Sequence, residues 1–123
     1  MPRERHSLWI RLIYSVCLAT GALMHWLDIA AAGWLPYRFA PLTFNAYWTG
    51  LAFADLLAAL LLWHRRPAIR WTGALLTLAI MISDVAINSY VRLYIAELPL
   101  FALTLQSAFL GFVILTIRHL RPE

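Results

Sequence analysis

The sequence predicts an all-α integral membrane protein, an antiparallel bundle of four transmembrane helices that forms a single domain over residues 1–123. Of the 123 residues, 63% are hydrophobic and only 13% are charged, which is too apolar for a soluble domain with a polar surface. Four mostly apolar stretches reach the length of about 20 residues that a membrane-spanning helix needs. They are residues 8–29, 44–63, 71–94 and 98–117. The connections between them are short, so consecutive helices are expected to be antiparallel neighbours.

The distribution of arginine predicts the orientation of these helices. The chain carries ten arginines, no lysine and a net charge of +4. Eight of the ten lie at the two termini or in the connection between the second and third spans: Arg3, Arg5, Arg11, Arg65, Arg66, Arg70, Arg118 and Arg121. Only Arg38 and Arg92 belong to the other side. Because basic residues accumulate on the cytoplasmic side, both termini are predicted to be cytoplasmic in a bacterial-type inner membrane, and no nucleic-acid partner is needed to explain the charge.

The first span has a polar face and an alternative interpretation. One helical face carries Arg11, Tyr14, Gly21, His25 and Asp28, and we expect it to point into the bundle. The alternative is a cleaved signal peptide, since basic residues precede the apolar run and three alanines follow it. His25 and Asp28 interrupt that run, which favours a helix that is retained. Cys17, the single cysteine, permits no internal disulfide and is interpreted as a small buried side chain.

The first outer connection and the second span follow. Residues 30–41 contain prolines and aromatic side chains, Tyr37 among them, and we expect a lid on the membrane surface with the aromatic rings as interfacial anchors. In the second span, Asp55 lies near the middle of the membrane. Its face also carries Trp48, Ala52, Ala58 and Ala59. Small residues beside a carboxyl indicate close helix packing or a cavity.

The third and fourth spans differ in how clearly they define an inner face. In the third, one polar stripe carries Gly73, Thr77, Asp84 and Asn88, so Asp84 and Asn88 are expected to look inward together. In the fourth, Gln106 lies on a different face from a stripe of small residues: Thr104, Ser107, Ala108 and Gly111. Small residues three or four apart allow helices to approach closely. Either face is therefore compatible with packing against the bundle.

Ionisable groups are costly inside a membrane, so each needs a partner, a water-filled cavity or a function. We expect those of the outer half and the middle to converge on one ligand-binding site. Its predicted residues are His25, Asp28, Trp48, Asp55, Asp84, Asn88 and Gln106. Three carboxyls in one low-dielectric space cannot comfortably all ionise. Asp55, Asp84 and His25 are the candidates for a catalytic role, while polar contacts that merely join helices, including a pairing of His25 with Asp28, remain an open alternative.

Metal ions and cofactors are not expected. His25, Asp28 and Asp84 could in principle hold a metal, but no second histidine lies at the same depth. A bis-histidine haem would need that histidine too. The chain also lacks a phosphate-binding loop and a dinucleotide fingerprint.

The first half of the chain resembles two groups of compact four-helix membrane proteins. It is similar to the DoxX-like family in Arg11, the small pair Gly21-Ala22 before His25, and an acidic residue, Asp55, in a second span rich in leucine and alanine. That family more often has glutamate at this place. Asp28 and Asp55 also occupy places similar to the acids of the EXPERA-type fold of sigma-2 receptor and emopamil-binding proteins. The segment from Asp84 to Asn88 matches neither group. The resemblance implies a membrane-embedded cavity for an apolar molecule with one polar or cationic group.

The leading functional hypothesis is a small inner-membrane protein that binds an apolar or amphipathic molecule, lipid- or quinone-like, in a polar pocket open toward the outer side. One alternative is an intramembrane acid/base enzyme, an isomerase or hydrolase, acting on a lipid-like substrate. Another is a non-catalytic membrane subunit, a transporter component or an immunity protein. The expected partners are the bilayer, a lipid-like small molecule, and a second copy or another membrane protein.

Overall fold

A computed structural model describes residues 2–123, and this part of the chain is helical without strands. The elements are α1 (Pro2–Ala32), α2 (Leu42–Leu61), α3 (Pro67–Tyr94), α4 (Leu100–Thr116) and a short 3-10 helix, η1 (Ile117–Leu120). The four predicted spans coincide with the four α-helices, which confirms the all-α prediction. With η1 extending the last one, all four helices are long and apolar enough to cross a membrane.

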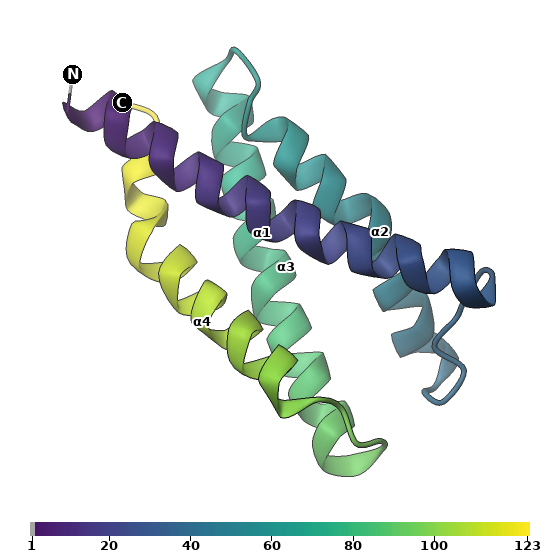
Figure 1. The fold of residues 1–123 in the computed structure, drawn as a ribbon. Coiled ribbons are helices and arrows are strands. Elements are labelled where there is room, and N and C mark those ends of the chain that lie inside the picture. Colours follow the sequence, from purple (N-terminus) through teal and green to yellow (C-terminus); the bar gives the residue numbers. More distant parts are fainter. Residues whose placement is uncertain (1) are drawn as a thin grey trace.

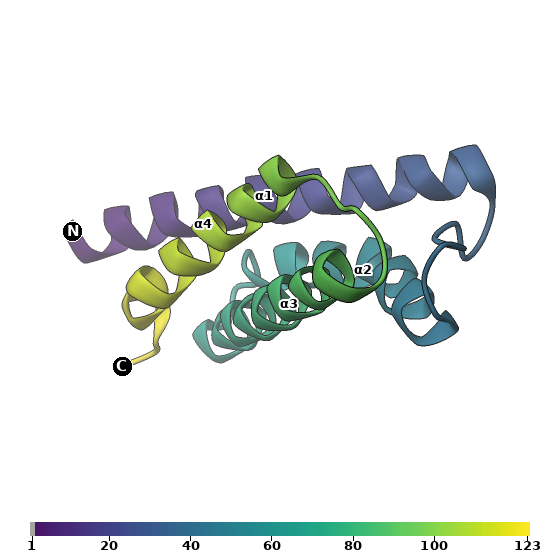
Figure 2. The same cartoon turned by 90° about the horizontal axis from the view of Figure 1, so that it is seen from below.

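The helices form two layers. Figures 1 and 2 show α1 and α4 in one layer and α2 and α3 in the other, with α1 crossing over α3. Consecutive helices run in opposite directions, and the two ends of the chain lie close together (Figure 1). The arginine-rich termini therefore share one end of the molecule.

The outward faces are strongly apolar. Leu60, Leu93 and Leu115 are 72%, 73% and 73% exposed, and they belong to α2, α3 and α4. An apolar surface spread over several helices would be unfavourable in water but suits contact with lipid. Phe53 of α2 is also exposed, whereas Leu78 of α3 is half-buried and packs against the core.

The inward faces pack closely and use backbone carbonyls as partners. Ala58 and Thr77 are fully buried, as their helical faces predict. The Trp26 indole of α1 donates to the Ala52 carbonyl of α2 over 3.0 Å. At the far end of the same helix pair, the Trp63 indole donates to Ser15 Oγ over 2.7 Å. These contacts hold α1 along the length of α2.

Tyr14 joins α1 to α4 at the arginine-rich end. Its hydroxyl donates to the Val113 carbonyl at 3.2 Å and lies 2.8 Å from Thr116 Oγ1. From this contact the two helices diverge toward the opposite end of the molecule (Figure 1).

The structure decides which face of α4 packs inward. Gln106 is half-buried and bonds to α3, whereas Thr104, Ser107 and Ala108 are exposed. The two hydroxyls of this outward stripe bond to carbonyls of their own helix, Thr104 to Leu100 and Ser107 to Leu103. The amide face, and not the stripe of small residues, therefore contacts the bundle.

The connection between α1 and α2 folds back over the end of the bundle. Gly33 ends α1 with φ +81° and donates its N–H to the Ile29 carbonyl over 2.7 Å, a left-handed helix ending that glycine favours. The buried side chain of Asn45 then holds the connection, because it accepts from the Tyr37 N–H and donates to the Leu35 carbonyl, both over 3.0 Å. These bonds place the Tyr37 side chain against the end of α1 and the start of α2.

Candidate functional site

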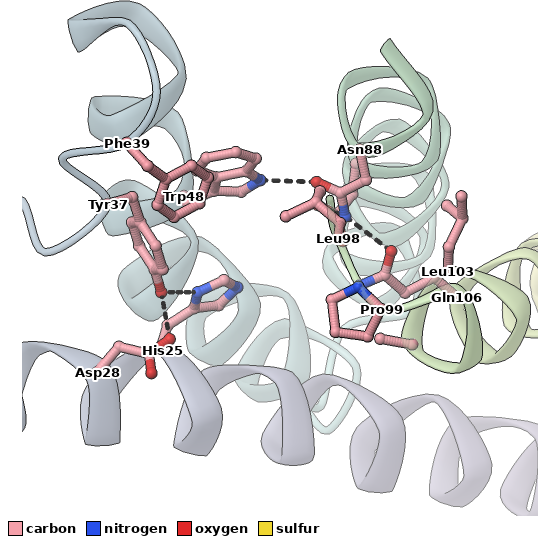
Figure 3. A pocket seen from close by; sticks show the side chains of 12 residues that line it. His25, Asp28, Tyr37, Phe39, Trp48, Asn88, Leu98, Pro99, Leu103 and Gln106 are labelled. Carbon is pink, nitrogen blue, oxygen red and sulfur yellow. Dashed lines mark hydrogen bonds between the residues drawn. The ribbon is translucent and has the colours of Figure 1, made fainter. Parts of the chain in front are cut away.

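A cavity of about 170 Å³ lies at this end of the bundle, where α1 and α4 have diverged. Its polar lining comprises His25, Asp28, Tyr37, Asp84, Asn88 and Gln106. Its apolar lining comprises Phe39, Trp48, Leu98, Pro99, Ala102 and Leu103. Figure 3 shows His25 and Tyr37 on one side of a gap and Leu98 and Gln106 on the other, with the hydrogen bond from Trp48 to Asn88 joining the two sides.

On the first side, Tyr37 bridges two polar residues of α1. Its hydroxyl lies 2.6 Å from His25 Nδ1 and donates to Asp28 Oδ2 over 2.7 Å. His25 and Asp28 are therefore linked through the phenol, and not by the direct pairing that was one alternative from the sequence. Burial and the neighbouring Asp28 raise the pKa of the Tyr37 phenol above its ordinary range, so the phenol keeps its proton at physiological pH.

This bridge fixes the hydrogen on the histidine ring. The single phenol hydrogen is donated to Asp28, so the hydrogen shared between Tyr37 and His25 must belong to His25 Nδ1. In the neutral ring, Nε2 is then an acceptor. Figure 3 shows that Nε2 points away from Tyr37 and into the gap, and that Gln106 lies on the other side of this gap. His25 thus offers the cavity a hydrogen-bond acceptor or, after protonation, a donor.

On the second side, Asn88 organises three neighbours. Its Oδ1 accepts from the Trp48 indole over 2.8 Å. Its Nδ2 donates to Asp84 Oδ1 over 3.1 Å and to Gln106 Oε1 over 2.7 Å. These bonds join α2, α3 and α4 through one side chain. Within residues 2–123 the Gln106 Nε2 has no hydrogen-bond partner, so its two N–H groups are left for a ligand or water.

The structure brings together six of the seven predicted ligand-binding residues, and Asp55 is the exception. Asp55 does not line the cavity. It is 5% exposed and lies against α1 at Gly21, where a Cβ would come within 2.9 Å of its Oδ2. It remains close enough to Asp84 for the two carboxyls to interact electrostatically. Asp55 shares a helical face with Trp48. The cavity, however, lies at the level of Trp48, about two turns closer to the start of α2, where the connection covers the bundle.

Sequence reasoning missed Tyr37 and Phe39 as site residues. Both lie in the first connection, where aromatic side chains were interpreted as interfacial anchors. Trp48 packs on both rings, with centroid distances of 5.3 Å to Tyr37 and 5.8 Å to Phe39. The available signal was the short distance in sequence between this aromatic connection and the polar end of α1. The asparagine that anchors the connection, Asn45, gave no comparable signal.

The cavity contains titratable groups but not a cluster typical of a metal site. Within residues 2–123, no three His, Cys, Asp or Glu side chains gather at metal-binding distances. What the arrangement offers is hydrogen bonding from two opposite sides inside a partly apolar wall. Such a site can orient a small polar ring or head group.

Comparisons with protein-family models, with curated proteins and with solved structures found no match to this chain. The DoxX-like and EXPERA-type resemblances therefore stay predictions from the sequence. Function has to be argued from the cavity itself.

Proposed function

We propose that the chain is a multi-pass protein of a bacterial-type inner membrane that binds the polar head of an amphipathic small molecule, lipid- or quinone-like, in the cavity near His25 and Gln106. The observation that carries the proposal is the pair of polar networks that face each other inside a cavity whose remaining walls are apolar (Figure 3). Each network is nearly complete and leaves a polar atom directed at the space between them.

The size of the cavity limits what can fill it. Its volume of about 170 Å³ is close to that of an engineered cavity of about 150 Å³ that binds benzene, and well below the 300 Å³ or more of typical drug-sized sites. It therefore accommodates one ring or a head group of that size. The apolar remainder of the molecule would extend past the apolar side chains of α4 that line the cavity, Ala102 and Leu103.

The polar groups define the chemistry of the head. A hydroxyl can donate to His25 Nε2, and a carbonyl or second hydroxyl can accept from Gln106 Nε2. A quinone or quinol ring carries oxygens on opposite sides and matches this arrangement. Asp28 and Tyr37 hold the histidine ring in the orientation that the match requires.

The orientation in the membrane follows from the charges. The two termini and the start of α3 meet at one end, because residues of all three line a common cavity, and the arginine-rich connection from α2 leads directly into α3. If this end faces the cytoplasm, as the excess of basic residues favours, the His25 cavity faces outward. A molecule in the outer half of the bilayer would then reach it.

Native mass spectrometry of protein released from its own membranes in mild detergent tests this function. We expect a specific small-molecule adduct on the wild type, and about tenfold lower occupancy in His25→Leu and in Gln106→Leu, because each variant removes one hydrogen bond from a buried site. Ser107→Ala is the matched control. This hydroxyl is next to Gln106 in sequence, but it points outward and bonds only to its own helix.

An adduct of equal intensity in all four proteins would show that the molecule binds elsewhere, and the proposal would be withdrawn. The proposal would also be withdrawn if the wild-type protein carried no adduct and failed to bind added quinones or lipids. The mass of the adduct names the ligand class directly.

A second candidate function, intramembrane acid/base catalysis, is favoured by one observation. The chain Asp28–Tyr37–His25 orients an imidazole with its free nitrogen toward the cavity, as a general base requires. In this case Asp84, on the opposite wall, is the candidate acid. Cells that express wild type or His25→Gln should then differ in the isomer or hydrolysis pattern of their extracted lipids and quinones, whereas identical extracts argue against catalysis.

A further inference from the structure

A second cavity of about 520 Å³ lies at the opposite, arginine-rich end of the molecule. The first turns of α1, the start of α3 and the segment around η1 enclose it. Its basic lining consists of Arg3, Arg11, Arg70, His119 and Arg121. This cavity shares no residue with the one near His25, so an inference about it does not depend on the function proposed above.

The carboxylates at this end do not neutralise the arginines. Glu4 and Glu123 also line the cavity, but Glu123 forms its ion pair with Arg3. Within residues 2–123 that is the only ion pair. Arg11 and Arg70 are close enough to repel each other electrostatically. Arg11 and Arg70 therefore place two positive charges against one shared space.

Arg11 is held in place with a donor left over. Its Nη1 donates to the Leu62 carbonyl over 3.2 Å, just beyond the end of α2, and its Cζ lies 4.9 Å from the centroid of the Trp63 ring. Its Nε is buried and has no hydrogen-bond partner, which distinguishes it from every other buried side-chain nitrogen or oxygen in the described residues. Buried donors are normally satisfied. An anionic ligand beside Arg11 would supply an acceptor for this donor.

Arg70 adds positive electrostatic potential to the cavity from the side of α3. It lies in the first turn of α3, where the helix dipole is positive. No side chain caps this helix, and its first residue, Pro67, also lines the cavity. Arg70 itself forms no side-chain hydrogen bond within residues 2–123. It is therefore free to bind an anion without breaking an existing contact.

We propose that this cavity binds a phosphate-bearing anion, with Arg11 and Arg70 as the residues that contact the phosphate oxygens. The planar guanidinium matches the geometry of phosphate oxygens better than an ammonium does. Basic pockets between membrane helices on the cytoplasmic side bind anionic lipid head groups. The volume exceeds that of a phosphate alone and leaves space for the atoms attached to it.

Binding of defined probes to the purified full chain in mild detergent tests the site. Native mass spectrometry should show dioleoyl phosphatidylglycerol retained in preference to dioleoyl phosphatidylcholine, which has the same tails but no net charge. Arg70→Gln should lower that affinity about fivefold or more, since one basic contact is lost. Arg66→Gln is the matched control, because Arg66 is an exposed arginine immediately before α3 and does not line the cavity.

A second arm separates a lipid from a soluble source of phosphate. If the natural ligand is soluble, inorganic phosphate should raise the melting temperature of the wild type and of Arg66→Gln, but not of Arg70→Gln, relative to chloride at equal ionic strength. A response to neither probe overturns the site. Equal losses in Arg66→Gln and Arg70→Gln also overturn it, because they would indicate diffuse attraction to a basic surface.

Discussion

At the scale of single residues, the cavity near His25 is built by side chains that each satisfy two partners. The Tyr37 hydroxyl joins His25 to Asp28, and the Asn88 amide joins Trp48 to Gln106. Each network immobilises a ring or an amide in an orientation that its own backbone would not impose. A ligand that meets such groups loses less entropy on ordering them. The bridging atoms are therefore the sensitive points of the site.

Removal of the Tyr37 hydroxyl should weaken binding without loss of the fold. In Tyr37→Phe the ring still packs on Trp48, but His25 loses the acceptor that holds its Nδ1 hydrogen. Loss of one such bond costs about 1 kcal/mol, equivalent to about fivefold in affinity. Native mass spectrometry of the adduct measures this loss. Tyr94→Phe is the control, since Tyr94 is 72% exposed, and equal affinity in Tyr37→Phe and wild type would contradict the proposed role of the bridge.

Asp55 and Asn88 should behave differently although both are buried polar residues inside the bundle. Asn88→Leu breaks bonds to Trp48, Asp84 and Gln106 and should lower ligand occupancy by about tenfold or more. Asp55→Asn should leave occupancy within about twofold of wild type, because Asp55 does not line the cavity and acts on it only through its electrostatic interaction with Asp84. Native mass spectrometry of the adduct measures the occupancy of both variants. A strong effect of Asp55→Asn would show that this carboxyl contributes to ligand binding after all.

At the scale of helices, close contacts between α2 and α3 depend on a missing side chain. A Cβ at Gly73 would lie 2.8 Å from Leu61 Cβ and 2.9 Å from the Leu62 backbone nitrogen. The end of α2 therefore rests directly on the first turns of α3, and this places the Leu62 carbonyl within reach of Arg11. The stripe of small residues on α4, by contrast, faces outward.

A methyl group at Gly73 should force the two helices apart. Gly73→Ala is expected to destabilise the protein by about 1–3 kcal/mol, the usual cost of overpacking a tight contact. Gly50→Ala is the control, because nothing lies within 4 Å of a Cβ there, and alanine should leave stability unchanged or raise it by up to about 1 kcal/mol. Thermal unfolding in detergent compares them. Equal melting temperatures would mean that α2 and α3 can separate at little cost.

At the scale of the whole molecule, the two ends differ in chemistry. One end carries the small cavity with apolar walls and two polar networks, and the other carries the larger basic cavity. Apolar side chains cover the helices between them, as the exposed leucines of α2, α3 and α4 show. A bilayer around these helices would place each end at a different surface, so the polarity of the molecule along its axis predicts its orientation.

Cysteine labelling tests that orientation. In a Cys17→Ser background, Trp34→Cys reports on the end with the His25 cavity and Arg65→Cys on the arginine-rich end. We expect a membrane-impermeant maleimide to label Trp34→Cys in intact cells and Arg65→Cys only after the membrane is opened, because an excess of basic residues at one end predicts that this end is cytoplasmic. The reverse pattern would invert the topology and place the His25 cavity on the cytoplasmic side.

The sequence by itself determined the number of helices and most of their inner faces. Apolar length defines a span, and helical periodicity places Tyr14, Ala52 and Thr77 on buried faces whatever their partners are. Only the tertiary structure decided the partners. The inner face of α4 depends on whether Gln106 meets Asn88, and the role of Tyr37 depends on a connection that Asn45 folds back over the bundle. Contacts between residues distant in sequence leave no periodic signal, so local pattern could place six of the predicted residues near one cavity but could not show that Asp55 lies outside it.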